Sequence, residues 1–158
     1  SVGVGFMLSV LYQNQGKIHE AISVLETLVE AHPDVLSITN NLAYLYAEHF
    51  SDKDHLEKAL LYAHSALEQA PENPEVLDTV ALAEFNMGHL QKALHYIGQA
   101  MAAAQDDPMI NYHAGLFHHE GGNAEKATAY LTRAIKLGLP ETYHKEAENL
   151  LQKHYPPS

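Results

Sequence analysis

Cysteine is absent from this chain of 158 residues, which excludes disulfide bonds and thiol chemistry. Basic residues are scarce as well. The chain has 9 Lys and Arg, spread singly, against 20 Asp and Glu, for a formal net charge of -11. A protein that binds nucleic acid or an anionic membrane surface needs a basic patch. The charge balance therefore argues against both kinds of partner.

Other signals are also missing. No apolar run approaches the roughly 20 residues that a membrane-spanning helix needs, and no signal peptide is visible. The opening stretch, SVGVGFMLSV, has neither a starting Met nor a basic region, so we expect a piece cut from a longer protein. No nucleophile–base arrangement, glycine-rich phosphate loop or strand–turn–helix motif is present, and we expect neither an enzyme nor a cofactor.

Histidine is abundant, with 12 residues. A metal site needs side chains that converge, whereas three consecutive helical residues, His118 to Glu120, point to different sides. We therefore expect no specific metal site. His113 and His119, beside Glu120, could instead gain charge at about pH 6.

Internal repetition dominates the rest of the sequence. The segments YQNQGKIHEAI, EFNMGHLQKAL and FHHEGGNAEKAT align, which makes Gly16, Gly88 and Gly122 equivalent. In the same register, further positions match across the units: Ala21, Ala59, Ala93 and Ala127, then Leu8, Leu42, Val80 and Ala114. Alanine at a helix crossing lets two backbones approach, and glycine after a helix supplies a left-handed end. Each unit is therefore predicted to form two amphipathic helices.

This pattern resembles the tetratricopeptide repeat (TPR), a helix–turn–helix of about 34 residues. The resemblance implies an all-α solenoid, a right-handed superhelix of four such units and a capping helix, in one domain spanning 1–158. The units are expected at 2–35, 36–73, 74–107 and 108–141, and the capping helix at 142–154. Unit two is longer than the others, and we expect a lengthened turn within AEHFSDKDHL with Asp52 or Asp54 capping the next helix. Whether residues 47–55 form a tolerated loop or a contact loop is left open.

The resemblance also implies which side chains face a concave groove, because the first helix of each TPR unit lines it. In NNLAYLYAEH, Leu42, Ala43 and Tyr46 are expected between helices. The resemblance assigns the expected partner-binding residues as Asn40, Asn41, Tyr44, Glu48, Asp78, Leu82, Phe85, Tyr112, His113, Leu116 and His119. Asparagine can bind the main chain of an extended peptide, aromatic rings provide apolar anchors, and the carboxylates favour a basic partner. Alternatively, several of these side chains contact only neighbouring helices.

One known TPR function can be tested on the residues. TPR domains that grip chaperone C-termini use a carboxylate clamp of Lys, Asn, Asn, Lys and Arg. The corresponding residues here are Phe6, Val10, Asn41, Glu75 and Thr79. Because only Asn41 matches, we expect no carboxylate clamp.

The predicted function is a protein-interaction scaffold that binds a basic or apolar segment of another protein in the groove. The alternative is self-assembly: Val4, Leu8 and Leu11 open the array without a polar cover, so either further repeats precede them or this edge pairs with another copy. The later repeats also resemble those of bacterial multi-TPR proteins, including ones tied to exopolysaccharide export and PEP-CTERM sorting. That resemblance implies an envelope or periplasmic setting, and a cytoplasmic one stays open.

Overall fold

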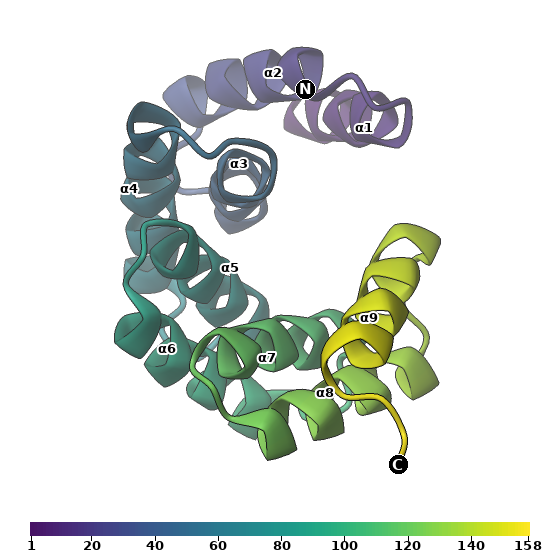
Figure 1. Cartoon of the computed structure of the whole chain (residues 1–158). Helices are drawn as coiled ribbons and strands as arrows, with labels where there is room; N and C mark the ends of the chain where they lie inside the picture. Colours follow the sequence, from purple (N-terminus) through teal and green to yellow (C-terminus); the bar gives the residue numbers. More distant parts are fainter.

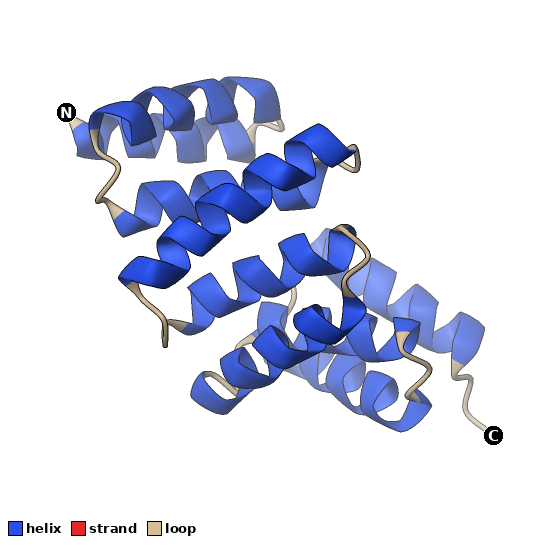
Figure 2. Ribbon diagram, turned by 90° about the vertical axis from the view of Figure 1, so that its left-hand side faces the viewer, coloured by secondary structure: helices blue, strands red, loops and turns tan.

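The computed structural model describes the whole chain, residues 1–158, as nine α-helices with no strand. The all-α fold is thereby confirmed. Figure 2 shows only helices joined by short loops. The helices are α1 (Val2–Asn14), α2 (Ile18–Ala31), α3 (Leu36–His49), α4 (Lys53–Gln69), α5 (Pro74–Asn86), α6 (Leu90–Ala103), α7 (Pro108–Glu120), α8 (Ala124–Leu137) and α9 (Glu141–His154).

The helices follow one another around an arc (Figure 1). The odd-numbered helices α1, α3, α5 and α7 lie on the inner side of the arc, and α2, α4, α6 and α8 form its outer side. Each helix packs on the next along the chain, and α3 also contacts α5. This arrangement gives the chain a concave surface made by the first helix of each pair. None of the helices is long and apolar enough to cross a membrane.

Short turns separate the two helices of each pair, and the local sequence explains them. Gly16, Gly88 and Gly122 have φ angles of 72°, 84° and 76°. Side chains with a Cβ rarely adopt such left-handed backbone, which accounts for glycine at these equivalent turns. The side chains of Asn73 and Asp107 accept from backbone N–H groups at the starts of α5 and α7, and a proline follows each as the first helical residue.

The expectation of a lengthened turn in the second unit is wrong. Only residues 50–52 separate α3 from α4, which matches the three-residue turns of the other pairs. Three extra residues extend α4 to 17 residues, against 14 in α6, and one extends α3 to 14 residues, against 13 in α5. Asp52 caps α4 by accepting from the backbone N–H of His55 at 3.2 Å, and the Phe50 ring stacks on His55 with centroids 4.0 Å apart. A capped helix start directly after the turn lets the insertion be absorbed as hydrogen-bonded helix.

Small residues define the contacts within each pair. Ala21, Ala59, Ala93 and Ala127, which occupy equivalent positions, are all 0% exposed. Among the glycines, Gly115 in α7 has the least room for a side chain. A Cβ placed there would lie 2.6 Å from Cγ of Leu131 and 3.2 Å from its backbone nitrogen. Since the backbone of α8 cannot move aside easily, α7 and α8 pack this closely only because residue 115 lacks a side chain.

Gly115→Ala should therefore destabilise the protein by about 1–3 kcal/mol, because the added methyl group overpacks the α7–α8 contact. Gly98→Ala is the matched control: it also lies inside a helix, α6, but nothing stands within 4 Å of its added Cβ. That control should stabilise the protein by about 0.5–1 kcal/mol through helix propensity alone. Urea unfolding of the two variants measures the difference, and equal effects would contradict the close packing at Gly115.

Candidate partner-binding groove

A hollow of about 470 Å³ opens on the concave side of the arc. Its lining comes from α1, α3, α5 and the start of α7, including the capping residue Asp107. The lining residues are Phe6, Val10, Gln13, Ser37, Asn40, Asn41, Tyr44, Glu75, Asp78, Thr79, Asp107, Pro108, Met109 and Ile110. The hollow thus combines side chains that lie up to about a hundred positions apart in the sequence, because the arc brings equivalent faces of successive helices together.

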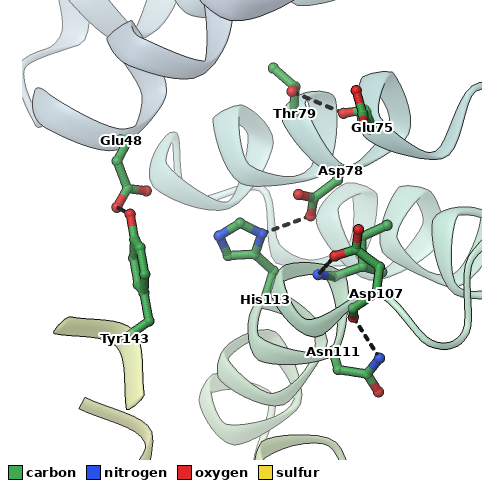
Figure 3. Close-up of polar contacts among 9 residues, drawn as sticks. Glu48, Glu75, Asp78, Thr79, Asp107, Asn111, His113 and Tyr143 are labelled. Atoms are coloured by element: carbon green, nitrogen blue, oxygen red, sulfur yellow. Dashed lines mark hydrogen bonds and ion pairs between the residues drawn. The ribbon is translucent and has the colours of Figure 1, made fainter. Parts of the chain in front are cut away.

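The charged groups around the hollow are all acidic, namely Glu75, Asp78 and Asp107. Local bonds hold its floor (Figure 3). The Thr79 hydroxyl donates to the carbonyl oxygen of Glu75 at 3.0 Å, and an Asp107 carboxylate oxygen accepts from the N–H of Ile110 at 3.0 Å. The Glu75 side chain is exposed. The hollow is therefore negatively charged. Its lining contains no Lys or Arg that could neutralise a bound carboxylate.

The five positions of the TPR carboxylate clamp converge on this hollow. Their occupants, Phe6, Val10, Asn41, Glu75 and Thr79, all line it. The five positions therefore lie on one hollow, in which apolar groups, a hydroxyl and a carboxylate stand where the clamp has all but one of its polar and basic side chains. A carboxylate ligand would be repelled by the charge of Glu75.

A buried ion pair connects the hollow to α7. Nδ1 of His113 donates to a carboxylate oxygen of Asp78 at 2.7 Å, and Figure 3 shows the ring of α7 pointing at this α5 side chain. His113 is 1% exposed and Asp78 is 7% exposed. Burial alone would lower the pKa of His113, but the charge and hydrogen bond of Asp78 raise the pKa overall. The expected neighbour Glu120 takes no part, so the predicted pH-sensitive group has a different carboxylate partner.

The capping helix α9 closes one side of the groove. The hydroxyl of Tyr143 donates to Glu48 of α3 at 2.7 Å, across 95 positions of sequence (Figure 3). The hydroxyl of Tyr112 in α7 donates to Glu146 of α9 at 2.6 Å. Burial raises the pKa of Tyr143 to about 12, which keeps this donor protonated at neutral pH. Two tyrosine–carboxylate bonds thus fasten α9 to the concave surface.

Tyr44 lies between the hollow and this α9 bridge. Burial, followed by the charge of Glu48, raises the pKa of Tyr44 well above its usual value. Its phenol therefore stays neutral and presents an aromatic face with a polar tip at the edge of the hollow. In the same helix, Leu42 and Ala43 are 0% exposed and Tyr46 is 3% exposed, so their predicted place between helices is confirmed.

The remaining predicted groove residues lie in three different settings. Asn40, Asn41, Tyr44 and Asp78 line the hollow, while Glu48, Tyr112 and His113 belong to the polar contacts beside it. Leu82 is 5% exposed and part of the core.

Phe85, Leu116 and His119 contact other parts of the chain. The Phe85 ring stacks on Phe117 with centroids 4.4 Å apart, and Leu116 packs against the core. Nδ1 of His119 lies 2.5 Å from the hydroxyl of Tyr155, in the C-terminal tail. These three side chains therefore have partners within the molecule, away from the hollow.

Sequence reasoning missed several residues of the hollow. Ser37, Asp107, Pro108 and Ile110 line it but are not among the family's groove positions, which also include Phe6, Val10, Gln13, Glu75, Thr79 and Met109. Asp107 caps α7 and Pro108 begins it, as Asn73 and Pro74 do for α5. The sequence shows that Asp107 and Pro108 are equivalent to Asn73 and Pro74 in the preceding unit. It does not show that they reach the hollow, because that depends on the curvature of the arc. No group of three or more His, Asp and Glu side chains in the structure could hold a metal ion.

The family model for the tetratricopeptide repeat matches residues 6–74 and 81–138, most of the chain. The chain belongs to the tetratricopeptide repeat family. TPR proteins generally serve as scaffolds for protein interactions, and the fold is generally non-enzymatic. A comparison with curated proteins finds no match.

Solved TPR structures share the fold. A thermophilic TPR protein of Thermus thermophilus superimposes with a TM-score of 0.79 at 20% identity, covering 96% of this chain and 81% of that one. MamA of Desulfovibrio magneticus, residues 41 to the end, gives a TM-score of 0.69 at 14% identity, covering 87% of this chain and 75% of that one. At these identities the likeness concerns the helical-repeat architecture alone.

Because the pKa of His113 is raised in the folded chain, the free energy of unfolding should depend on pH. The folded chain binds this proton more tightly than the unfolded chain, so the contribution is fully present below about pH 6.5 and is lost as the pH rises through the raised folded pKa. His113→Gln should remove this contribution. The stability difference between the natural chain and the variant should therefore shrink with rising pH, by up to about 1.4 kcal/mol per pH unit within that window. Urea unfolding over a pH series measures it.

Asp78→Asn is the companion variant for this experiment. It removes the main carboxylate that raises the His113 pKa and leaves the burial that lowers it, so it should weaken or reverse the same pH dependence, and the double variant, which lacks the imidazole, should show none from this site. A stability difference that stays constant across the pH series would contradict the role of this pair.

Proposed function

We propose that this protein is an interaction scaffold whose hollow binds an extended segment of a partner protein with basic and apolar side chains. The observation that carries the proposal is the convergence of the five clamp positions on one hollow in which Glu75 replaces a cation. The shape of the hollow suits an extended peptide. Because the hollow is negatively charged, it favours a positively charged side chain, whereas the clamp recognises a negatively charged C-terminal carboxylate.

Electrostatics supports a basic partner. The lining carries Glu75, Asp78 and Asp107 with no Lys or Arg, and the chain has a net charge of -11. The charge of Asp78 is partly balanced by His113, whereas the exposed carboxylate of Glu75 has no ion-pair partner within the molecule. Glu75 is therefore the residue best placed to attract a Lys or Arg side chain, and the field of the whole chain steers such a partner inward.

Two polar atoms in the hollow suit the main chain of an extended peptide. Nε2 of Gln13 and Oδ1 of Asn40 are shielded from solvent and have no hydrogen-bond partner within the protein. Both residues line the hollow. A buried donor and a buried acceptor left unpaired are costly, and an extended segment offers both a carbonyl oxygen and an N–H group. Binding would therefore satisfy groups that the free protein leaves unmatched.

Apolar contact would anchor the segment. Phe6, Val10, Tyr44 and Met109 approach the hollow from α1, α3 and α7, so apolar side chains surround its polar floor. Aromatic rings at the centre of such a site contribute much of the binding energy. The resemblance of the later repeats to those of exopolysaccharide-export proteins stays a prediction, which would place the partner in a bacterial envelope.

Selection from a random peptide library on the immobilised protein tests this proposal. Peptides enriched on the natural chain should combine Lys or Arg with apolar residues, and should bind more weakly as salt is raised. Asn41→Ala/Tyr44→Ala should weaken their binding at least about tenfold, because both side chains line the hollow. Isothermal calorimetry with the selected peptides measures the loss.

Glu75→Lys and Leu61→Ala complete the design. Glu75→Lys restores a cation at a clamp position and should reverse the charge preference toward acidic peptides. Leu61→Ala, on the outer helix α4, should leave binding unchanged. Enrichment of acidic peptides on the natural chain, or equal binding by all variants, would contradict the proposal.

A further inference from the structure

Asp78 is the lining residue of the hollow that also bonds to a histidine. A carboxylate oxygen of Asp78 accepts from Nδ1 of His113, while the residue lines the hollow from α5. The other two carboxylates of the lining differ, because Glu75 has no ion-pair partner and Asp107 accepts from the N–H of Ile110. A cation bound in the hollow would therefore share a carboxylate with an imidazole at Asp78 alone.

The two sides of the Asp78 carboxylate differ in access. His113 lies behind it and is 1% exposed, whereas the Asp78 side chain, which lines the hollow, is 10% exposed. Figure 3 shows the imidazole bonded to one of the two carboxylate oxygens. The other oxygen accepts no hydrogen bond within the protein. A basic side chain that enters the hollow can therefore bind this second oxygen while the first stays bonded to the imidazole.

The charge on His113 depends on that carboxylate. Burial lowers the pKa of His113, and the charge and hydrogen bond of Asp78 raise it, with a net rise. The second ring nitrogen, Nε2, is shielded from solvent and has no hydrogen-bond partner. A buried N–H group without an acceptor is costly, so the protonated ring is stabilised chiefly by the negative charge of Asp78.

Other charged groups near His113 bond to different residues. Glu48 of α3 and Asp107 also raise the pKa of His113 through their charge. Glu48 accepts from Tyr143 of α9, and Asp107 caps α7. Charged side chains on the remaining helices around α7 have partners elsewhere: Arg133 of α8 bonds to Asp106, His89 at the start of α6 to Glu84, and Glu146 of α9 to Tyr112. A change at Asp78 is therefore the change that His113 senses most strongly.

We propose that a Lys or Arg side chain of the partner binds Asp78 from the hollow and displaces the proton of His113, so that binding tightens as the pH rises. This coupling rests on the proposed function, because the basic segment must be bound there. Two cations on one carboxylate repel each other, so the complex holds the proton of His113 less tightly than the free chain does. The proton leaves Nε2 for solvent, and the Nδ1 proton stays in its bond to Asp78.

The sign of the effect follows from linkage. The pKa of His113 in the free folded chain is raised above 6.5, and below that pKa the ring is charged and opposes the incoming cation. Affinity should therefore increase as the pH approaches this pKa from below, by up to about tenfold per pH unit, and should level off above it. A Lys side chain of the partner keeps its charge over this range.

Isothermal calorimetry over a pH series tests the coupling. The probe is the Lys-bearing peptide that the library selection enriches most, and the same peptide with its lysines replaced in turn by norleucine is the matched control. Titrations in two buffers with different ionisation enthalpies count the protons released. The probe should release up to one proton and bind more tightly at higher pH. The peptide that lacks the lysine bound at Asp78 should bind more weakly and release none.

Variants of the protein assign the proton. His113→Gln and Asp78→Asn should both give a flat pH profile, because the first removes the imidazole and the second the shared carboxylate. Glu75→Gln should weaken binding at every pH and keep the slope. His95→Gln, which replaces an exposed histidine of the outer helix α6, should behave like the natural chain. Circular dichroism checks that each variant is folded.

A further check needs no variant. In an NMR titration of the imidazole signals of the natural chain, the signal of His113 should titrate at a lower pH with the probe bound than without it. Binding that is independent of pH, or that releases no proton, would overturn the coupling and leave the proposed function intact. An equal slope in His113→Gln and the natural chain would overturn it as well. Failure of every basic peptide to bind at any pH would contradict the proposed function itself.

Discussion

Close packing of the two helices within each repeat is the contact on which the rest of the structure depends. Ala21, Ala59, Ala93 and Ala127 have no exposed surface, and Gly115 brings α7 against the backbone of α8. Because side chains there are minimal, the two helices of each pair pack closely as one block, and successive blocks stack side by side along the chain. That stacking curves the array and turns the first helices inward (Figure 1).

The curvature of the array determines which side chains line the groove. Residues of α1, α3, α5 and α7, which lie on separate helices, face one hollow. A few substitutions at equivalent positions therefore change what the hollow can bind. Glu75 makes the hollow acidic where the related clamp is basic. The repeated packing thus decides which side chains meet at the hollow.

Polar bonds then fix the concave side. Asp78 and His113 join α5 to α7, and Tyr143 joins the capping helix to Glu48 of α3. The first contact is buried and the second is half-buried. Away from water, a hydrogen bond to a charged group is stronger and a missing partner is costly. They add specific bonds to apolar contacts between the same parts of the chain, namely the stack of Phe85 on Phe117 and the cluster that Tyr112, Leu131 and Ala147 form where α9 packs.

The sequence by itself determined the repeat, the helix pairs, the glycine turns and the capping residues, because these follow from spacing and local backbone chemistry. It also placed Asn40, Asn41, Tyr44 and Asp78 on the inner helices. It could not show that Leu82 is buried, that His113 meets Asp78 or that the insertion lengthens α4. Those outcomes depend on how far each block rotates against the next, and that angle is set by packing between side chains distant in sequence, so only the tertiary structure decides them.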